Sequence, residues 1–120
     1  MKQNVVKDKS FAFAIRIVKL HRHLNEHKKE YTMAKQLLRS GTAVGALIRE
    51  AEHAESTADF IHKLAVAQKE INESIYWIEL LHATDYLTIE QLASINNDAV
   101  ELIRIITSII KTTKASPRKK

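Results

Sequence analysis

Two Glu-x-x-His pairs are the residues in this sequence best suited to hold metal ions: Glu50 with His53, and Glu79 with His82. In some four-helix bundles, two such pairs join two further Glu residues around a pair of metal ions. Here each pair stands near the C-terminal end of one of two consecutive predicted helices, which a short loop makes antiparallel. The pairs therefore fall at opposite ends of a bundle, about 30 Å apart at 1.5 Å per residue. The sequence predicts no metal site and no cofactor.

A second arrangement of reactive side chains is an Arg five residues before a His, as in Arg22 with His27 and Arg16 with His21. The spacing is like that of some helical ribonucleases, which use general acid–base chemistry. The chain has 6 His and 19 Lys and Arg, so such pairs also arise by chance. No glycine-rich phosphate loop, nucleophile elbow or paired-carboxylate motif occurs. We therefore expect no enzyme.

Basic residues near both ends of the chain are the more credible functional feature of a protein with a net charge of +5. Residues 1–30 hold eight Lys or Arg against three Asp or Glu, residues 111–120 hold five against none, and residues 56–110 hold three against eight. Such clusters bind phosphates with little sequence preference, because binding releases counterions. No aromatic residues interleave them to stack on bases. The candidate nucleic-acid-binding residues are Arg16, Lys19, Arg22, Lys28, Lys29, Lys111, Lys114, Arg118, Lys119 and Lys120.

The composition narrows the class of protein further. A chain of 120 residues, 45% of them hydrophobic, is long enough for one domain with one core. The absence of Cys excludes disulfides, thiol catalysis and Cys-ligated zinc, and it is compatible with a reducing cytoplasm. No apolar run approaches the roughly 18–20 residues that span a bilayer. Arg16 and Lys19 interrupt the apolar stretch that a signal peptide would need. We expect a cytoplasmic protein with no membrane partner.

Apolar residues recur at helical spacing in four segments separated by short connections. The pattern predicts an all-α fold, an antiparallel up-down-up-down four-helix bundle. Its single domain covers residues 1–110, with helices at about 11–27, 31–54, 57–83 and 89–113, and a basic disordered tail covers 114–120.

Polar and small residues mark where these helices begin and cross. Ser10, Ser56 and Thr88 are the expected N-caps, the last of them in a capping box. Gly41 and Gly45 are each unfavourable inside a helix by about 1 kcal/mol relative to Ala. Their presence indicates a close helix crossing, either within the bundle or at a subunit contact.

The first predicted helix is apolar on two sides. One stripe, Phe11, Ala14, Ile15 and Val18, is assigned to the core. Since a helix that is apolar all round is buried all round, the remaining apolar surface predicts a homo-oligomer, unless this helix sits centrally and hides both stripes. The candidate oligomer-interface residues are Phe13, Ile17, Leu20 and Leu24 on this helix, and Val66, Trp77 and Leu80 on the third.

Several segments resemble the bacterial four helix bundle protein family, whose genes occur as intervening sequences in 23S ribosomal RNA genes. They are Gln36-Leu-Leu-Arg39-Ser-Gly-Thr-Ala-Val-Gly45, Ile48-Arg-Glu50-Ala, Ser56-x-x-Asp59-Phe60-Ile-x-x-Leu64, Trp77-Ile-Glu-Leu-Leu and Asp85-Tyr-Leu. The superfamily includes the accessory variability determinant of diversity-generating retroelements. The resemblance implies a homopentameric barrel and, for the retroelement members, binding to nucleic acid and to a reverse transcriptase. Ala43 and Leu47 depart from the Ser and Asn usual in the family, which removes polar groups from the second helix.

The leading hypothesis from the sequence is a non-enzymatic homo-oligomeric scaffold that binds RNA, DNA or a ribonucleoprotein through its basic residues. The alternative is a protein-interaction module without nucleic-acid binding, for which Trp77 and Leu80 would be the contact. The third is an RNA-cleaving or metal-dependent helical enzyme.

Overall fold

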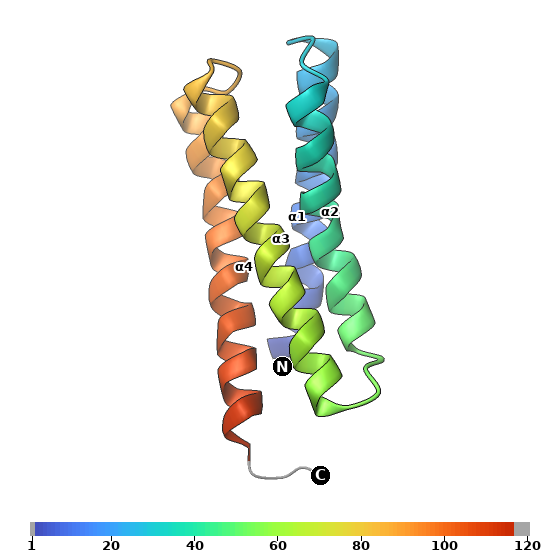
Figure 1. Ribbon diagram of the computed structural model, residues 1–120. Coiled ribbons are helices and arrows are strands. Elements are labelled where there is room, and N and C mark those ends of the chain that lie inside the picture. Colours follow the sequence, from blue (N-terminus) through green and yellow to red (C-terminus); the bar gives the residue numbers. More distant parts are fainter. Residues whose placement is uncertain (1, 117–120) are drawn as a thin grey trace.

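Four amphipathic segments form four helices in the computed structural model, which describes residues 2–116 and their side chains from residue 5 onward. The helices are α1 (Lys2–Glu26), α2 (Thr32–Ala51), α3 (Thr57–Ala83) and α4 (Ile89–Ala115). Consecutive helices run in opposite directions (Figure 1). The predicted all-α up-down-up-down bundle is therefore confirmed.

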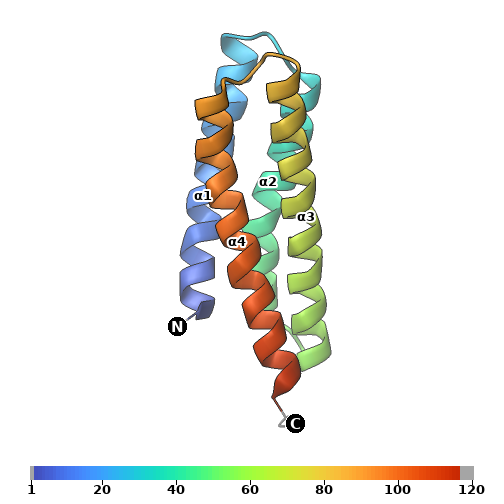
Figure 2. The same cartoon turned by 90° about the vertical axis from the view of Figure 1, so that its left-hand side faces the viewer.

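The helices pack around a square in chain order: α1 on α2, α2 on α3, α3 on α4, and α4 back on α1. Helices α1 and α3 are therefore diagonal neighbours, as are α2 and α4 (Figure 2). The contact between α2 and α3 is the most extensive and that between α1 and α4 the least. The bundle measures 51 Å along its axis and 22 by 19 Å across. Among residues 2–116, no helix combines the length and apolar character needed to cross a bilayer.

The core runs the length of the bundle and consists of large aliphatic side chains from all four helices. Apolar side chains at helical spacing on α2, α3 and α4 face it. Its fully buried members include Leu37 and Val44 of α2, Leu64, Ile71, Ile78 and Leu81 of α3, and Leu102 and Ile106 of α4.

The assignment of the two apolar stripes on α1 was wrong. Phe13, Ile17 and Leu24, expected at a subunit interface, are buried in the core, and Leu20 is half-buried against it. Phe11 and Ile15, expected in the core, are 53% and 42% exposed.

The reason for this reversal lies in the length of the two stripes. Helix α1 begins at Lys2, and over this length the buried stripe continues through Val6 and Ser10. The stripe that contains Phe11 runs instead into charged residues, Lys7 on one side and Arg22 on the other. The longer apolar stripe lies on the core because it buries more apolar surface.

The predicted start of the first helix at Ser10 was also wrong. Ser10 is buried inside α1, and its hydroxyl donates to the carbonyl of Lys7 at 3.0 Å instead of capping a helix end. Helix α2 ends at Ala51, three residues earlier than expected, and α4 continues to Ala115. Lys114 is therefore helical, and residues 117–120 of the predicted tail lie outside the described part of the chain.

The helix starts at Ser56 and Thr88 were predicted correctly. Ser56 Oγ accepts a hydrogen bond from the Asp59 N–H at 3.0 Å. Thr88 Oγ1 accepts from the Gln91 N–H at 3.1 Å, and Gln91 Oε1 accepts from the Thr88 N–H at 2.9 Å. This reciprocal pair is the expected capping box, and it begins α4 at Ile89.

Candidate nucleic-acid interface

The basic residues singled out in the sequence are spread over the bundle and form no single patch. Lys28 and Lys29 lie in the connection between α1 and α2, at one end of the bundle (Figure 1). Lys111 and Lys114 lie in the last turns of α4, at the opposite end. Arg118, Lys119 and Lys120 are outside the described residues.

Three of the basic residues of α1 are paired with carboxylates on or directly after neighbouring helices. Lys7 Nζ lies 3.3 Å from Glu52 Oε1, and Lys9 Nζ lies 3.1 Å from Glu101 Oε2. These ion pairs are partly exposed and each contributes less than about 1 kcal/mol to stability. They nevertheless reduce the positive potential that this helix presents to a polyanion.

Arg16 is bound most firmly, because its guanidinium crosses from α1 to α4. It donates from Nη1 to Asp98 Oδ2 at 2.6 Å and to the Ser94 carbonyl at 3.2 Å, and from Nη2 to Ser94 Oγ at 2.7 Å. Arg16 therefore ties together the two helices that pack least extensively, and its donors are largely used within the chain.

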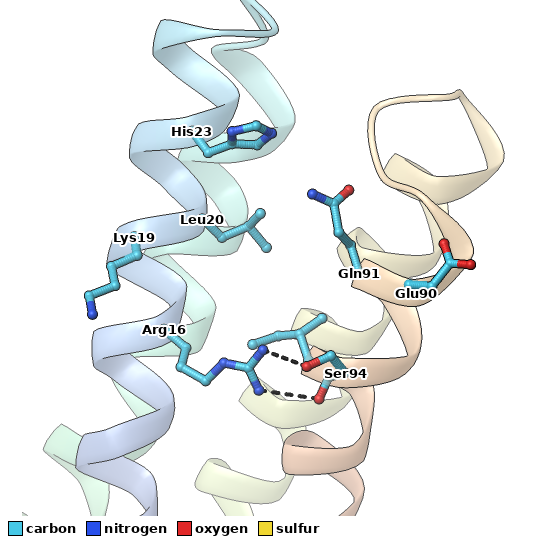
Figure 3. A pocket seen from close by; sticks show the side chains of 8 residues that line it. Arg16, Lys19, Leu20, His23, Glu90, Gln91 and Ser94 are labelled. Carbon is cyan, nitrogen blue, oxygen red and sulfur yellow. Dashed lines mark hydrogen bonds between the residues drawn. The ribbon is translucent and has the colours of Figure 1, made fainter.

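A groove of about 530 Å³ lies between α1 and α4 beside this arginine. In Figure 3 the Arg16 side chain reaches across to Ser94, while Lys19 points away from α4. The ring of His23 lies 5.3 Å from that of His27, and its Nε2 is buried with no hydrogen-bond partner among the described residues. The rim of the groove includes the carboxylate of Glu90, so the groove carries charges of both signs. The lining residues are Arg16, Lys19, Leu20, His23, Glu90, Gln91, Ser94 and Ile95.

Within residues 5–116, none of the basic residues in the C-terminal half of α4 has a carboxylate nearby, whereas three of those on α1 are paired. We define the α4 basic face as Arg104, Lys111 and Lys114. No carboxylate oxygen within residues 5–116 lies within 4.0 Å of the side-chain nitrogens of these three residues, whereas Lys7, Lys9 and Arg16 are paired. The three residues lie within about 80° of one another around the helix and span about 15 Å along it.

Hydroxyl groups lie between these cations, in a shallow depression of about 530 Å³. Gln68 Nε2 of α3 donates to Thr107 Oγ1 at 2.8 Å, which holds this hydroxyl in place and leaves its proton to donate elsewhere. The depression is lined by Ile103, Arg104, Thr107, Ser108, Lys111 and Thr112. Cations interleaved with hydroxyls are the side chains that contact phosphate and sugar oxygens in nucleic-acid complexes.

Arg104 was missed in the sequence because it belongs to a predominantly acidic segment. The signal for it was present: it stands seven residues before Lys111, so the two side chains lie on nearly the same line of the helix. The last acidic residue of the chain is Glu101, and none follows it.

The residues proposed for metal or acid–base chemistry do not converge. Glu50 lies in the last turn of α2, with its Oε1 3.5 Å from Lys63 Nζ. His82 lies in the last turn of α3 at the other end of the bundle, with Nδ1 2.9 Å from the Leu87 carbonyl oxygen. Within residues 5–116, no group of three or more His, Asp or Glu side chains is placed to hold a metal ion. A five-residue spacing also separates each Arg from its His by about 140° around a helix. Arg16 accordingly contacts α4, while His21 Nε2 lies 3.3 Å from Asn25 Nδ2 on α1 itself.

The expected interface residues of α3 are half-buried, with the chain's only tryptophan among them. Trp77 packs against the core and donates from Nε1 to Glu73 Oε2 at 3.0 Å. Arg39 of α2 pairs with the same carboxylate. These two hydrogen bonds, that of Arg39 being the stronger influence, lower the pKa of Glu73 below its usual 4.5. The exposed aromatic residue beside them is Tyr76, which is 55% exposed.

Comparison with known proteins gives the same fold in a close relative. Residues 2–108 match the family described as 23S rRNA-intervening sequence protein. A crystal structure of a protein with unknown function from the S23 ribosomal protein family of Bacteroides thetaiotaomicron is 59% identical to this chain. It superposes with a TM-score of 0.92 over 92% of this chain and 99% of its own. No curated protein matches the chain.

Proposed function

The chain belongs to the 23S rRNA-intervening sequence protein family, and we propose that it is a non-enzymatic homo-oligomeric scaffold that binds nucleic acid through the α4 basic face. The observation that carries this proposal is the contrast between two sets of cations. Those of α1 at Lys7, Lys9 and Arg16 are paired with carboxylates, whereas the α4 basic face is unpaired and interleaved with hydroxyls.

The chemistry of this face favours recognition of the phosphate backbone. Each Lys or Arg that neutralises a phosphate releases counterions, which drives binding without regard to sequence. Helix α4 contains no Phe, Trp or Tyr, so it offers no ring on which unpaired bases would stack. We therefore propose duplex or structured nucleic acid as the ligand.

Lys28 and Lys29 are less suited to this role, although both are exposed. They lie between Glu26 and Glu30, whose charges reduce the local positive potential. The chain after Glu101 contains basic residues and no acidic ones.

Self-association is the second part of the proposal. The large hydrophobic residues Phe11, Ile15 and Tyr76 are each more than 40% exposed, and an oligomer would bury them. The resemblance to the pentameric barrels described above favours five subunits. Repeating the α4 basic face in each subunit would strengthen binding to a long polyanion through multivalency.

A binding titration with the full-length protein tests this function. Structured RNA and duplex DNA would be titrated at low salt in a mobility-shift assay, and light scattering would report the subunit count with and without the ligand. We expect binding that weakens steeply as salt is raised. Absence of binding at low salt, or binding that is independent of salt, would overturn the proposal.

A protein-interaction module is the second candidate, favoured by the exposed ring of Tyr76 beside half-buried Leu80. Capture of a protein partner that survives high salt, without any nucleic-acid binding, would identify that class. A nuclease assay on the same RNA, with His27→Ala for comparison, would separate binding from cleavage.

A further inference from the structure

We infer that two different surfaces of this chain join neighbouring subunits: the outer side of α1 in one copy packs on the outer side of α3 in the next. The inference rests on the proposed self-association and names the surfaces that produce it. We define the α1 outer face as Phe11, Ile15, Val18 and Arg22, and the α3 outer face as Tyr76, Glu79 and Leu80.

The two faces hold three of the six large hydrophobic side chains that are exposed within residues 5–116. Phe11 and Ile15 are 53% and 42% exposed, with Val18 half-buried beside them on the next turn of α1. On α3, Tyr76 is 55% exposed, and Leu80 follows one turn later. Each face is one helix wide, so a facing helix of comparable length would cover it.

The two faces lie at the same level along the bundle axis. Ile17 of α1 is level with Gly41 of α2, since a Cβ at position 41 would stand 2.7 Å from Ile17 Cγ1. Ser40, the preceding residue of α2, is level with Ser74 of α3, because their hydroxyl oxygens are 2.8 Å apart. Helices α1 and α3 run in the same direction, so positions equally far beyond Ile17 and Ser74 remain level.

This register brings opposite charges and apolar groups together in a ring. Rotation about an axis parallel to the bundle preserves height, so only residues at one level meet between neighbours. Arg22 and Glu79 each lie five residues beyond these reference points, about 7.5 Å along the helix. Both are exposed, and neither forms an ion pair within residues 5–116. Between the levels of Ile15 and Arg22, Tyr76 would cover Val18.

The contact joins two unlike surfaces, so it links copies head to tail and forms a ring where the rotation between copies closes, or a filament where it does not. The α1 outer face leans toward α2, since the guanidinium of Arg49 on α2 lies 5.3 Å from the ring centre of Phe11. On α3, Glu79 lies on the side of α4, about 20° around the helix from Gln68, which donates to Thr107 of α4. The resemblance to pentameric barrels favours the ring. Neither outer face includes a residue of the α4 basic face.

Two single substitutions on exposed residues test the contact. Ile15→Glu blocks the α1 outer face and Tyr76→Glu blocks the α3 outer face, and circular dichroism would verify that both variants remain helical. In sedimentation velocity, each variant alone should be a monomer. An equimolar mixture should form a dimer and nothing larger, because one intact α1 face and one intact α3 face remain.

Other sedimentation results would overturn the contact in recognisable ways. If Ile15→Glu is monomeric, Tyr76→Glu keeps the wild-type size and the mixture contains no complex between the two variants, the α1 face pairs with itself. If both variants keep the wild-type size, the subunits associate through other surfaces, and the proposed homo-oligomer still stands. A wild-type protein that sediments as a monomer would remove the proposed self-association together with this contact.

A charge reversal across the contact gives an independent readout. Arg22→Glu should weaken the assembly at least tenfold in the concentration needed for association, and adding Glu79→Arg should restore it. Lys28→Glu, with the same charge change in the α1–α2 connection, should leave assembly unchanged. Failure of Glu79→Arg to rescue Arg22→Glu would contradict the proposed pairing.

Discussion

Gly41 of α2 lies against Ile17 of α1 with no room for a methyl group between them. A Cβ at position 41 would stand 2.7 Å from Ile17 Cγ1 and 2.9 Å from Cγ2, closer than such atoms approach in proteins. Ile17 is fully buried, so its side chain cannot turn into solvent to make room. The close crossing expected from the two glycines is therefore an internal one at Gly41. At Gly45 the nearest atom, the Ser10 carbonyl oxygen, would be 3.5 Å away, an ordinary contact distance.

This difference predicts opposite effects for the same substitution at the two glycines. Gly41→Ala should destabilise the bundle by about 1–2 kcal/mol, because the cost of overpacking exceeds the gain in helix propensity. Gly45→Ala should be neutral or stabilising by up to about 1 kcal/mol. Urea denaturation of both variants measures the difference, and equal free energies of unfolding would contradict the packing described here.

Helix α2 begins with a cap that its sequence did not suggest. Tyr31, in the N-cap position, provides no side-chain acceptor, and Glu30 replaces it by accepting from the Ala34 N–H at 2.8 Å and the Met33 N–H at 3.2 Å. Glu30→Ala should therefore cost about 1 kcal/mol in the free energy of unfolding. Glu26→Ala, at the exposed end of α1, should change it by less than about 0.5 kcal/mol. A similar loss in both variants would show that Glu30 acts only as a surface charge.

Protonation of the Glu73 carboxylate should change the fluorescence of Trp77, whose indole N–H donates to it. Its pKa is lower in the folded chain than the usual 4.5, chiefly because of the hydrogen bond from Arg39 and then that from Trp77. The charged carboxylate therefore adds stability above pH 4.5, and this contribution is lost as the pH falls through the folded pKa. The difference in the free energy of unfolding between the wild type and Glu73→Gln should disappear as the pH falls through the folded pKa of Glu73.

The fluorescence transition of the wild type should have its midpoint below pH 4.5, and Arg39→Gln should move it upward. Far-UV circular dichroism at each pH would verify that the bundle remains folded. Equal midpoints in the wild type and Arg39→Gln would contradict the assigned cause of the shift in pKa.

The sequence predicted the helices better than it predicted how α1 is oriented. The regular apolar spacing and the caps at Ser56 and Thr88 determine α3 and α4 locally, and these elements begin where expected. On α1 both stripes fit a helix equally well, and the choice between them depends on the full length of the helix and on its neighbours. The predicted N-cap at Ser10 was wrong because a serine within a helix can also donate its hydroxyl to the carbonyl three residues back.

The candidate site was only partly predictable from the sequence, because residues far apart in the chain determine which cations are paired. Lys111 and Lys114 were identified from the absence of acidic residues around them. The guanidinium of Arg16 is bound by Asp98 and Ser94, which approach it only when α4 packs on α1. Which cations remain unpaired is therefore a property of the folded chain.

The dependence of nucleic-acid binding on salt tests the central claim most directly. Each phosphate neutralised on duplex DNA contributes about 0.9 to the slope of log K against log salt concentration. Replacing Arg104, Lys111 and Lys114 with Gln should weaken binding and reduce this slope by about one for each phosphate that is no longer neutralised. A variant with Lys28, Lys29 and Lys35 replaced by Gln carries the same net charge and should retain most of the wild-type slope. If the two variants fall equally in affinity and slope, or if the α4 variant binds as the wild type does, the α4 basic face is not the nucleic-acid interface.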